Sequence, residues 1–298
     1  MDIVFVGVTT ASSLVHRALP AWGPLLGRAL GLRGVDIGLG ADDGTYARLL
    51  GELRADDGVA GAVVTSHKAA VFRAGRALFA HLDPLAVACE EVNAISRRAD
   101  GLHGWARDPV SVGRVVDRIW PGAQGQVVCL GAGGTAVALA HHLFATREAV
   151  RLVCADRDHG AVENLSRLAG RPVLGYVGEG PWDDLVSAAP PGSLIVNATG
   201  LGKDRPGSPT TSQARFPRRA VLWELNYRGD LQFLNAGRAQ ADGSGLQVHD
   251  GWQLFCHGWA AALTVILDLP DDDELGDRFA GAAQPFRPRP VDLHRAPG

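Results

Sequence analysis

Three glycines, Gly131, Gly133 and Gly134, have the spacing needed to hold the pyrophosphate of a dinucleotide. They separate an apolar run at 126–130, which predicts a strand, from an apolar stretch at 135–146, which predicts a helix. Glycine permits a sharp turn and lets the backbone approach a phosphate, whose negative charge the N–H groups at the start of the helix stabilise. A dinucleotide fingerprint requires this strand–turn–helix context. We therefore expect a dinucleotide site here, with a purely structural turn as the alternative.

An acidic residue, Asp156, follows the next apolar run and bears on which dinucleotide binds. At this place an acidic side chain bonds the ribose hydroxyls of NAD and repels the 2′-phosphate of NADP. Asp158 is a second candidate for that role. Arg157 favours the opposite choice, because an arginine there can pair with the phosphate of NADP. The sequence predicts NAD and keeps NADP as the alternative, and a solvated turn is the structural explanation of the same residues.

The elements that must position these residues alternate along the chain. Short apolar runs at 3–8, 35–39 and 61–65 predict strands, with helical stretches between them. After a turn-rich break at 120–125 the same pattern restarts. Strands that alternate with helices favour mainly parallel sheets whose faces are covered by helices, so we expect an α/β fold.

The composition excludes several classes of function. A net charge of −3 provides no broad attraction to nucleic acid or to an anionic membrane. No apolar stretch approaches the ~20 residues that span a bilayer, and the first residues lack the pattern of a signal peptide. The four cysteines are far apart and show no zinc spacing. We expect a cytoplasmic protein that binds no nucleic acid, membrane or metal.

Six segments occur in the order found in shikimate and quinate dehydrogenases, and the sequence resembles that family from Val4 to about Leu267. The resemblance implies two α/β domains, in which an N-terminal substrate-binding domain precedes a Rossmann-type dinucleotide-binding domain. The segments are Thr65 to Lys68, Glu91-Val92-Asn93-Ala94, Gly104 to Asp108, the glycine turn, Asn197-Ala198-Thr199-Gly200 and Asp250-Gly251.

The family's domain order sets the boundaries that we expect. The substrate-binding domain should cover 1–108 and be completed by 245–283, where the chain returns to it. The Rossmann-type domain should cover 109–244. The segment 284–298 is rich in proline and should form a loosely held tail.

The resemblance implies that Lys68 and Asp108 are the catalytic pair and face the substrate hydroxyl, next to the nicotinamide in a cleft between the domains. Lysine is rare in this chain, since Lys68 and Lys203 are the only two among 29 basic residues. Removing a hydride from an alcohol carbon requires the hydroxyl proton to leave as well, and a lysine beside a carboxylate can accept or donate it. Burial would lower the pKa of this lysine and the carboxylate would raise it. A surface lysine is the alternative.

The resemblance also assigns further contacts to the substrate and to the cofactor. For most of these residues a structural role is the alternative: a turn for the asparagine, a strand-end hydroxyl for the first threonine, and buried packing for the tyrosine and the histidine. The expected substrate contacts are Ser13, Thr65, Asn93, Tyr227 and His257, and Thr135 and Thr199 join the glycines as expected cofactor contacts.

Several positions depart from the family pattern, all of them on the substrate side. Val15 replaces the second of two serines that bind the substrate carboxylate, and Val63 replaces an asparagine. His257 stands where the family has a glutamine, and Arg107 is either a new anion contact or a solvated turn residue. Because a site that loses hydrogen-bonding groups changes its preferred substrate, we expect a dehydrogenase of a related cyclic hydroxy acid or cyclitol.

Two other interpretations remain open at this point. The chain could be an authentic shikimate or quinate dehydrogenase, or a non-catalytic regulatory protein that keeps the fold. In each case the partner is a small cyclic hydroxylated molecule, and the chain is a monomer or a homodimer.

Overall fold

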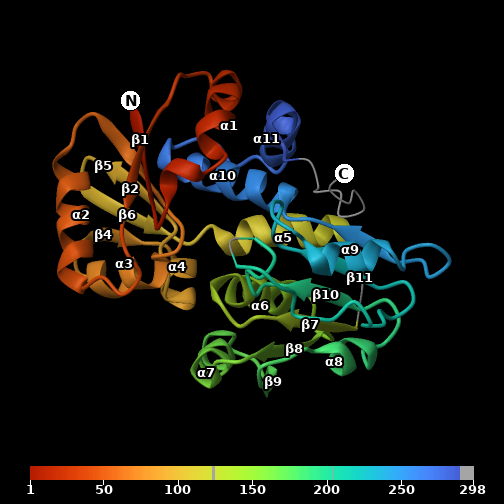
Figure 1. Ribbon diagram of the computed structural model, residues 1–298. Coiled ribbons are helices and arrows are strands. Elements are labelled where there is room, and N and C mark those ends of the chain that lie inside the picture. Colours follow the sequence, from red (N-terminus) through yellow and green to blue (C-terminus); the bar gives the residue numbers. More distant parts are fainter. Residues whose placement is uncertain (123–124, 204, 289–298) are drawn as a thin grey trace. The chain divides into compact units, whose positions relative to one another are not determined.

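The structure is a computed structural model that describes residues 1–122, 125–203 and 205–288 (Figure 1). The chain divides into two compact units. Unit 1 contains Met1–Ser111 and Cys256–Phe286, and unit 2 contains the described residues of Val112–Phe255 together with Arg287 and Pro288. Each unit is built on one sheet with helices, which confirms the predicted two-domain α/β class.

Unit 1 has a six-stranded mixed sheet in the order β2-β1-β3-β5-β6-β4. Pairs β1·β2, β1·β3 and β4·β6 are parallel, whereas β3·β5 and β5·β6 are antiparallel. The expected mainly parallel pairing holds for three of the five strand pairs of this sheet, and the other two involve β5, which a two-residue turn joins to its antiparallel neighbour β6. The strands are β1 (Asp2–Gly7), β2 (Gly31–Asp36), β3 (Val59–Val64), β4 (Phe79–Leu82), β5 (Ala94–Arg98) and β6 (Gly101–Trp105).

Helices alternate with the strands of unit 1 along the chain, and further helices come from the segment that returns to this unit. Strand β3 is apolar and buried along its whole length, as expected of a central strand with both faces packed. It ends just before α3, so the loop between them sets the place of Lys68. The helices are α1 (Val15–Trp22), α2 (Asp43–Ala55), α3 (Lys68–Gly75), α4 (Pro84–Cys89) and α11 (Leu275–Ala283), with short 3-10 turns at Thr10–Ser12, Gly23–Leu26 and Gln284–Phe286. The chain passes between the units within α5 (Asp108–Ile119) and within α10 (Trp252–Ile266).

Unit 2 has a six-stranded parallel sheet in the order β12-β11-β10-β7-β8-β9. The strand order reverses beside β7, which gives the switch point where Rossmann-type folds bind their ligand, at the carboxyl ends of the strands. The strands are β7 (Gln126–Leu130), β8 (Arg151–Asp156), β9 (Leu174–Val177), β10 (Leu194–Asn197), β11 (Val221–Glu224) and β12 (Gln247–His249), and the helices are α6 (Gly134–Thr146), α7 (His159–Leu168), α8 (Asp183–Ser187) and α9 (Gln232–Arg238).

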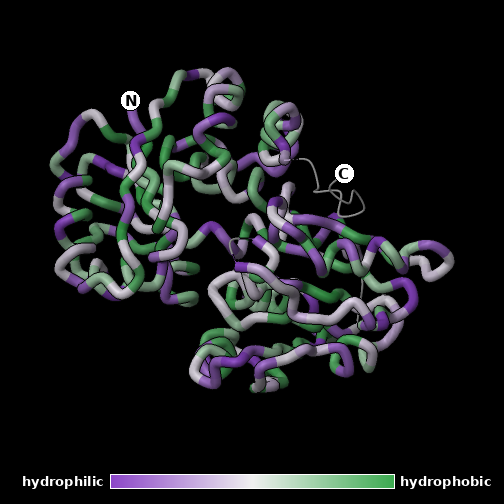
Figure 2. Tube along the Cα trace, in the orientation of Figure 1, coloured by the Kyte–Doolittle hydropathy of each residue, from purple (hydrophilic) through white to green (hydrophobic). Residues whose placement is uncertain are grey.

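Hydrophobic residues are concentrated in the strands, as Figure 2 shows for both units. Each sheet packs a buried apolar core against its own helices. Among the described residues, no helix is both long enough and apolar enough to cross a bilayer.

Two predicted boundaries differ from the observed units. The chain returns to unit 1 at Cys256 and not at 245, because β12 pairs with β11 and extends the second sheet. The segment predicted as a loose tail begins with an ordered 3-10 turn at Gln284–Phe286. The ring of Phe286 in this turn packs against Arg17, whose guanidinium lies 5.3 Å from the ring centre. The next residue, Arg287, forms an ion pair with Asp250. Residues 289–298 of the expected tail lie outside the described residues.

Candidate active site and nucleotide site

The turn before Lys68 is held by a buried histidine. His67 precedes α3, and its Nδ1 lies 2.9 Å from the hydroxyl of Tyr46. Its Nε2 lies 2.9 Å from the carbonyl oxygen of Ile37. Because a carbonyl oxygen only accepts, we assign the proton to Nε2, and Tyr46 then donates to Nδ1. The two bonds fix the start of the helix that carries Lys68, and no sequence motif pointed to them.

The structure brings Lys68 and Asp108 together within unit 1. The Lys68 ammonium donates a hydrogen bond to Oδ2 of Asp108. The same ammonium lies 3.5 Å from Oε2 of Glu91. Only 18% of the Lys68 side chain is exposed, and the exposed fractions are 22% for Asp108 and 5% for Glu91. One ammonium is thus enclosed by two carboxylates, so Lys68 is not the surface lysine of the alternative interpretation.

Burial and charge act in opposite directions on the pKa values of this group. Burial lowers the pKa of Lys68, but the charges of Asp108 and then Glu91 raise it by more, and the net shift is upward. Burial raises the pKa of Glu91 to about 7, against the opposing effect of Lys68. Glu91 lies within one of the family segments, but the sequence predicted no role for it. The available signal was a carboxylate placed directly before two buried residues, Val92 and Asn93.

Asn93 orients the carboxylate of Asp108. Its Nδ2 donates to Oδ1 of Asp108, and its Oδ1 accepts the backbone N–H of Arg107 at 2.7 Å. Its backbone pairs with Trp105 on one side and with Val64 on the other. Asn93 therefore ties together three segments of the sheet and holds Asp108 toward Lys68. This positioning contact was not predicted, and the predicted bond to a substrate hydroxyl stays a prediction.

Two of the expected substrate contacts, Thr65 and Ser13, lie near the surface of unit 1, whereas the two apolar replacements are buried. The hydroxyl of Thr65 is at the surface side of its strand end and donates to the carbonyl of Val6 at 3.1 Å. Ser13 is half-buried, and its Oγ lies 3.5 Å from the backbone nitrogen of Val15. The replacements Val15 and Val63 are both buried, with exposed fractions of 0% and 7%. Two positions that hold polar groups in the family are apolar core positions here.

His257 has the environment of a packing residue. Its side chain is fully buried, and its Nε2 lies 3.3 Å from Oδ1 of Asp277 on α11. A Cβ added at Gly276 would lie 2.2 Å from the imidazole, so α10 and α11 approach this closely only because residue 276 is glycine. These contacts support the structural alternative for His257 and not a substrate contact.

Arg107 and Tyr227 are also engaged by neighbours. The Arg107 guanidinium lies 3.7 Å from Oδ1 of Asp271, and 13% of its side chain is exposed. Arg107 is therefore not a solvated turn residue. Its positive charge is balanced by Asp271, which is distant in the sequence, so it is not an open site for a substrate anion. In unit 2, the half-buried ring of Tyr227 lies 4.9 Å from that of Phe255 and 6.0 Å from that of Trp252, measured between centres.

The glycine turn of unit 2 has the geometry that a phosphate cradle needs. Gly131 has φ +108°, and a Cβ there would lie 2.7 Å from the backbone of Ala198. Gly133 caps the N-terminus of α6, and a Cβ there would meet nothing within 4 Å. Gly133 and Gly134 are exposed, and Thr135 is half-buried in the first helical turn. The N–H groups at the start of this 13-residue helix are therefore accessible to an anion.

Asp156 connects the end of β8 to the glycine turn. Its carboxylate accepts the backbone N–H of Ala132 at 2.8 Å and that of Asp158 at 3.0 Å. Asp158 caps α7 by accepting from the N–H of Ala161, so the second candidate for ribose binding already has a structural role. Arg157 is exposed.

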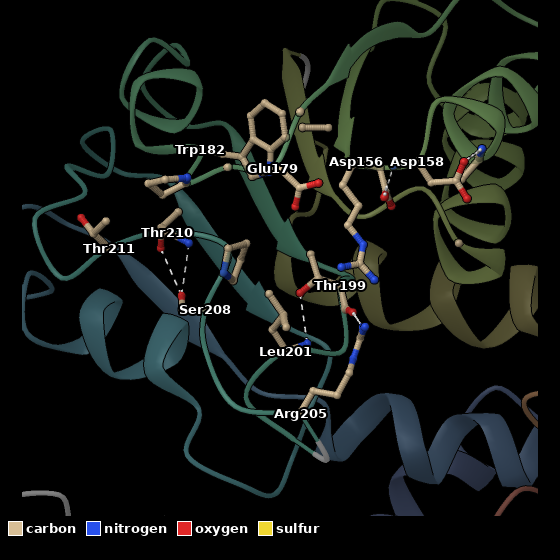
Figure 3. A pocket seen from close by; sticks show the side chains of 18 residues that line it. Asp156, Asp158, Glu179, Trp182, Thr199, Leu201, Arg205, Ser208, Thr210 and Thr211 are labelled. Carbon is tan, nitrogen blue, oxygen red and sulfur yellow. Dashed lines mark hydrogen bonds between the residues drawn. The ribbon is translucent and has the colours of Figure 1, made fainter.

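A cavity of about 610 Å³ borders these residues. Figure 3 shows Asp156 and Trp182 along one side of it, and Thr199 and Arg205 along the other. Gly133 and Arg157 also line the cavity, and Arg205 donates to the carbonyl of Thr199 at 2.8 Å. A volume of this size is within the range of small-molecule and cofactor sites. The residues present therefore fit the adenosine half of a dinucleotide.

A buried carboxylate holds the strand ends beside this cavity. Asn197 accepts the N–H and the hydroxyl of Thr199, and donates to Glu224 at 2.6 Å. Glu224 also accepts two hydrogen bonds from Asn226. Burial raises the pKa of Glu224 to about 7, although these hydrogen bonds oppose the shift. Glu224 was not singled out from the sequence, and the Thr199 hydroxyl is used within its own turn.

No group of metal-ligating side chains occurs within 1–122, 125–203 and 205–288. Within the described residues, the acid–base group of unit 1 is the candidate for proton transfer and the glycine turn of unit 2 is the candidate for phosphate binding.

Comparisons with known proteins point to one group of enzymes. No family model matches the chain. A shikimate dehydrogenase (NADP(+)) of Methylobacterium radiotolerans is 32% identical over 206 residues, which are 65% of this chain and 70% of that protein. One of Anaeromyxobacter dehalogenans is 28% identical over 190 residues. The match covers 63% of this chain, which spans just under two thirds (66%) of that relative's length.

Solved structures share the fold over nearly the whole chain. Quinate dehydrogenase from Corynebacterium glutamicum in complex with NAD aligns with a TM-score of 0.75 and 23% identity, over 96% of this chain and 99% of that one. Shikimate 5-dehydrogenase from Thermus thermophilus in complex with NADP(H) and shikimate aligns with a TM-score of 0.73 and 23% identity, with the same coverage of both chains. At this identity the likeness establishes the two-domain fold with its Rossmann-type unit.

Proposed function

The chain belongs to the shikimate dehydrogenase family, and we propose that it is an NAD(P)-dependent dehydrogenase that interconverts a hydroxyl group and a ketone on a cyclic substrate. The observation that carries this proposal is the Lys68 ammonium held between Asp108 and Glu91, in a chain that also has a glycine turn fitted to a pyrophosphate. A proton carrier and a dinucleotide cradle are the two parts that hydride transfer to or from an alcohol carbon requires.

In this proposal Lys68 moves the proton of the substrate hydroxyl. During ketone reduction the ammonium donates a proton to the oxygen that gains negative charge, and during alcohol oxidation the amine accepts it. Asp108 stabilises the ammonium, and Asn93 keeps the Asp108 carboxylate aimed at Nζ. A nicotinamide dinucleotide bound at the glycine turn supplies or accepts the hydride.

We propose NAD as the preferred cofactor. Asp156 places a carboxylate at the end of β8, on the border of the cavity, where it would repel a 2′-phosphate. NADP is the alternative, since Arg157 and Arg205 line the same cavity and are cations that could offset this repulsion. The relatives' names include NADP(+), and the Corynebacterium glutamicum structure contains NAD, so each cofactor has a precedent in a similar protein.

We further propose a substrate that lacks the shikimate carboxylate or binds it differently. The buried Val15 and Val63 present no hydrogen-bonding group where the family has a serine and an asparagine. Arg107 does not compensate as an anion contact, because Asp271 lies beside its guanidinium. A cyclitol or a related cyclic hydroxy acid satisfies the proposed chemistry without those contacts.

One assay panel tests both parts of the proposal. Shikimate, quinate and several cyclitols are each incubated with NAD and with NADP, and nicotinamide absorbance is followed. We expect turnover of a substrate other than shikimate and a higher kcat/KM with NAD. Strong turnover of shikimate would overturn the altered-substrate proposal, and a higher kcat/KM with NADP would overturn the cofactor preference. No turnover of any compound would count against the dehydrogenase itself.

A further inference from the structure

We propose that Glu91 is a positioning residue for the dehydrogenase reaction and acts through Lys68. Glu91 exchanges a proton with Nζ of Lys68, so that Lys68 can become a free amine inside the protein. The inference rests on the proposed function, because it assigns a role within that reaction. It concerns a carboxylate that the proton transfer described above does not use.

The geometry of Glu91 is unusual for a structural ion pair. Its side chain is 5% exposed, and Oε2 lies 3.5 Å from Nζ of Lys68, at the outer limit of a hydrogen bond. Its other oxygen, Oε1, is buried and has no hydrogen-bond partner in the described part of the chain. A buried carboxylate with an unsatisfied oxygen costs free energy, and Lys68 already has a closer partner in Asp108. Stability alone therefore gives no reason for a glutamate here.

Burial favours a form of Glu91 that holds a proton, while the charge of Lys68 opposes that form and the charge of Asp108 supports it. Lys68 faces it from α3, and Asp108 faces it from the start of α5. The Cys89 thiol, at the end of α4, is also near, and burial and then Glu91 raise its pKa to about 12, so it stays neutral. With both carboxylates ionised, this buried group carries one negative charge in excess. Burial accordingly raises the pKa of Glu91 to about 7, so the acid and the carboxylate are both populated near neutral pH.

The exchange balances in both directions of the reaction. One N–H bond of the Lys68 ammonium breaks and an O–H bond forms at Oε2, so an ion pair becomes an amine and a carboxylic acid with no change in net charge. The amine then accepts the substrate hydroxyl proton while the hydride leaves the substrate carbon for the nicotinamide. In ketone reduction the order reverses. The Lys68 ammonium first donates its proton to the substrate oxygen, and the protonated Glu91 then returns a proton to the resulting amine. The ion pair is the more stable form, because the charges of Asp108 and Glu91 raise the pKa of Lys68, so the amine and the acid exist together only transiently during turnover. Without Glu91 the proton of the ammonium would have to leave to solvent.

The first test is a pH–rate profile with the compound from the panel that turns over fastest. We expect Glu91→Gln to lower kcat for alcohol oxidation at pH 7 by about 10- to 100-fold and to remove the inflection near pH 7. Glu91→Asp keeps a titrating group and should retain an inflection. Glu90→Gln, on the adjacent residue, is the matched control and should keep the parent profile. A folded Glu91→Gln protein with the parent kcat and inflection would overturn the inference.

A second measurement is independent of activity. In a Lys203→Arg background, Lys68 is the only lysine, so labelling with ¹⁵N-lysine gives one Nζ signal to follow by NMR. We expect this signal to shift in a step near pH 7 as Glu91 titrates, and the step to be absent in Glu91→Gln. A signal with no step in the parent would overturn the inference even in an active enzyme. If no compound is turned over while the step is present, the proposed function fails and the proton exchange stands.

Discussion

At the scale of single residues, the chemistry depends on how few groups surround Lys68 and how completely they enclose it. Asp108 and Glu91 come from different parts of the chain, and each presents one carboxylate oxygen to the same ammonium. Asn93 controls the direction of one carboxylate, while His67 controls the turn from which the ammonium projects. A change at any of these positions should alter proton transfer before it alters the fold of unit 1.

The catalytic assignment predicts the effect of removing either partner. Lys68→Ala should lower kcat by about 10²- to 10⁴-fold, since no other described group is held where Nζ lies. Asp108→Asn keeps the shape but removes a charge, so the amine protonates less readily and ketone reduction should slow. Steady-state kinetics with the panel substrate measures both, and Lys203→Ala is the lysine control. Unchanged turnover in folded Lys68→Ala would refute the assignment.

At the scale of elements, the glycine turn between β7 and α6 determines whether a nucleotide can approach the backbone. Gly131 and Gly133 serve this turn in different ways. The first has a positive φ and faces the backbone of Ala198, whereas the second points into open space. Asp156 ties the turn to β8, so the cradle is held to the strand whose carboxylate we propose to bind the ribose.

Alanine at each glycine should therefore give a different result. Gly131→Ala forces a Cβ to within 2.7 Å of the backbone at positive φ, and should lower the free energy of unfolding by about 1–3 kcal/mol. Gly133→Ala meets no protein atom within 4 Å, so stability should hold while NAD affinity falls because the methyl group faces the pyrophosphate. Urea unfolding and calorimetry with NAD separate the two effects. Equal losses of stability would contradict this account of the turn.

At the scale of the whole molecule, each unit contains one buried carboxyl group whose pKa is raised to about 7. Between about pH 4.5 and pH 7, Glu91 and Glu224 hold protons in the folded state that the unfolded chain has lost. A state that binds more protons becomes relatively less stable as pH rises. These groups therefore destabilise the fold least at the acid end of this window.

The pH dependence of stability follows from this sign. The free energy of unfolding of the parent protein should fall as pH rises from 5 to 7, by on the order of 1–3 kcal/mol for each group. Glu91→Gln should remove the part of this fall in the free energy of unfolding that comes from Glu91, and Glu90→Gln should leave the fall unchanged. Urea unfolding at several pH values measures the slope. A Glu91→Gln protein whose stability has the same slope as the parent between pH 5 and 7 would show that Glu91 is ionised throughout this window.

Much of this molecule follows from local pattern, and the remainder depends on distant partners. The alternation of strands and helices, the glycine turn and the ends of β3 and β8 were predicted because each is a property of a short window. The environments of Arg107 and His257 could not be predicted, because their partners Asp271 and Asp277 lie far from them in the chain. The return at Cys256 was missed because β12 is a three-residue strand defined only by its pairing with β11.

The rarity of lysine has a practical consequence. Lys68 is enclosed as an ammonium by two carboxylates, whereas Lys203 is exposed. Amine-directed reagents, which require an accessible unprotonated amine, should therefore label Lys203 and spare Lys68. The protein can carry a fluorescent dye or be immobilised on a sensor surface through Lys203, with the side chain of Lys68 unmodified.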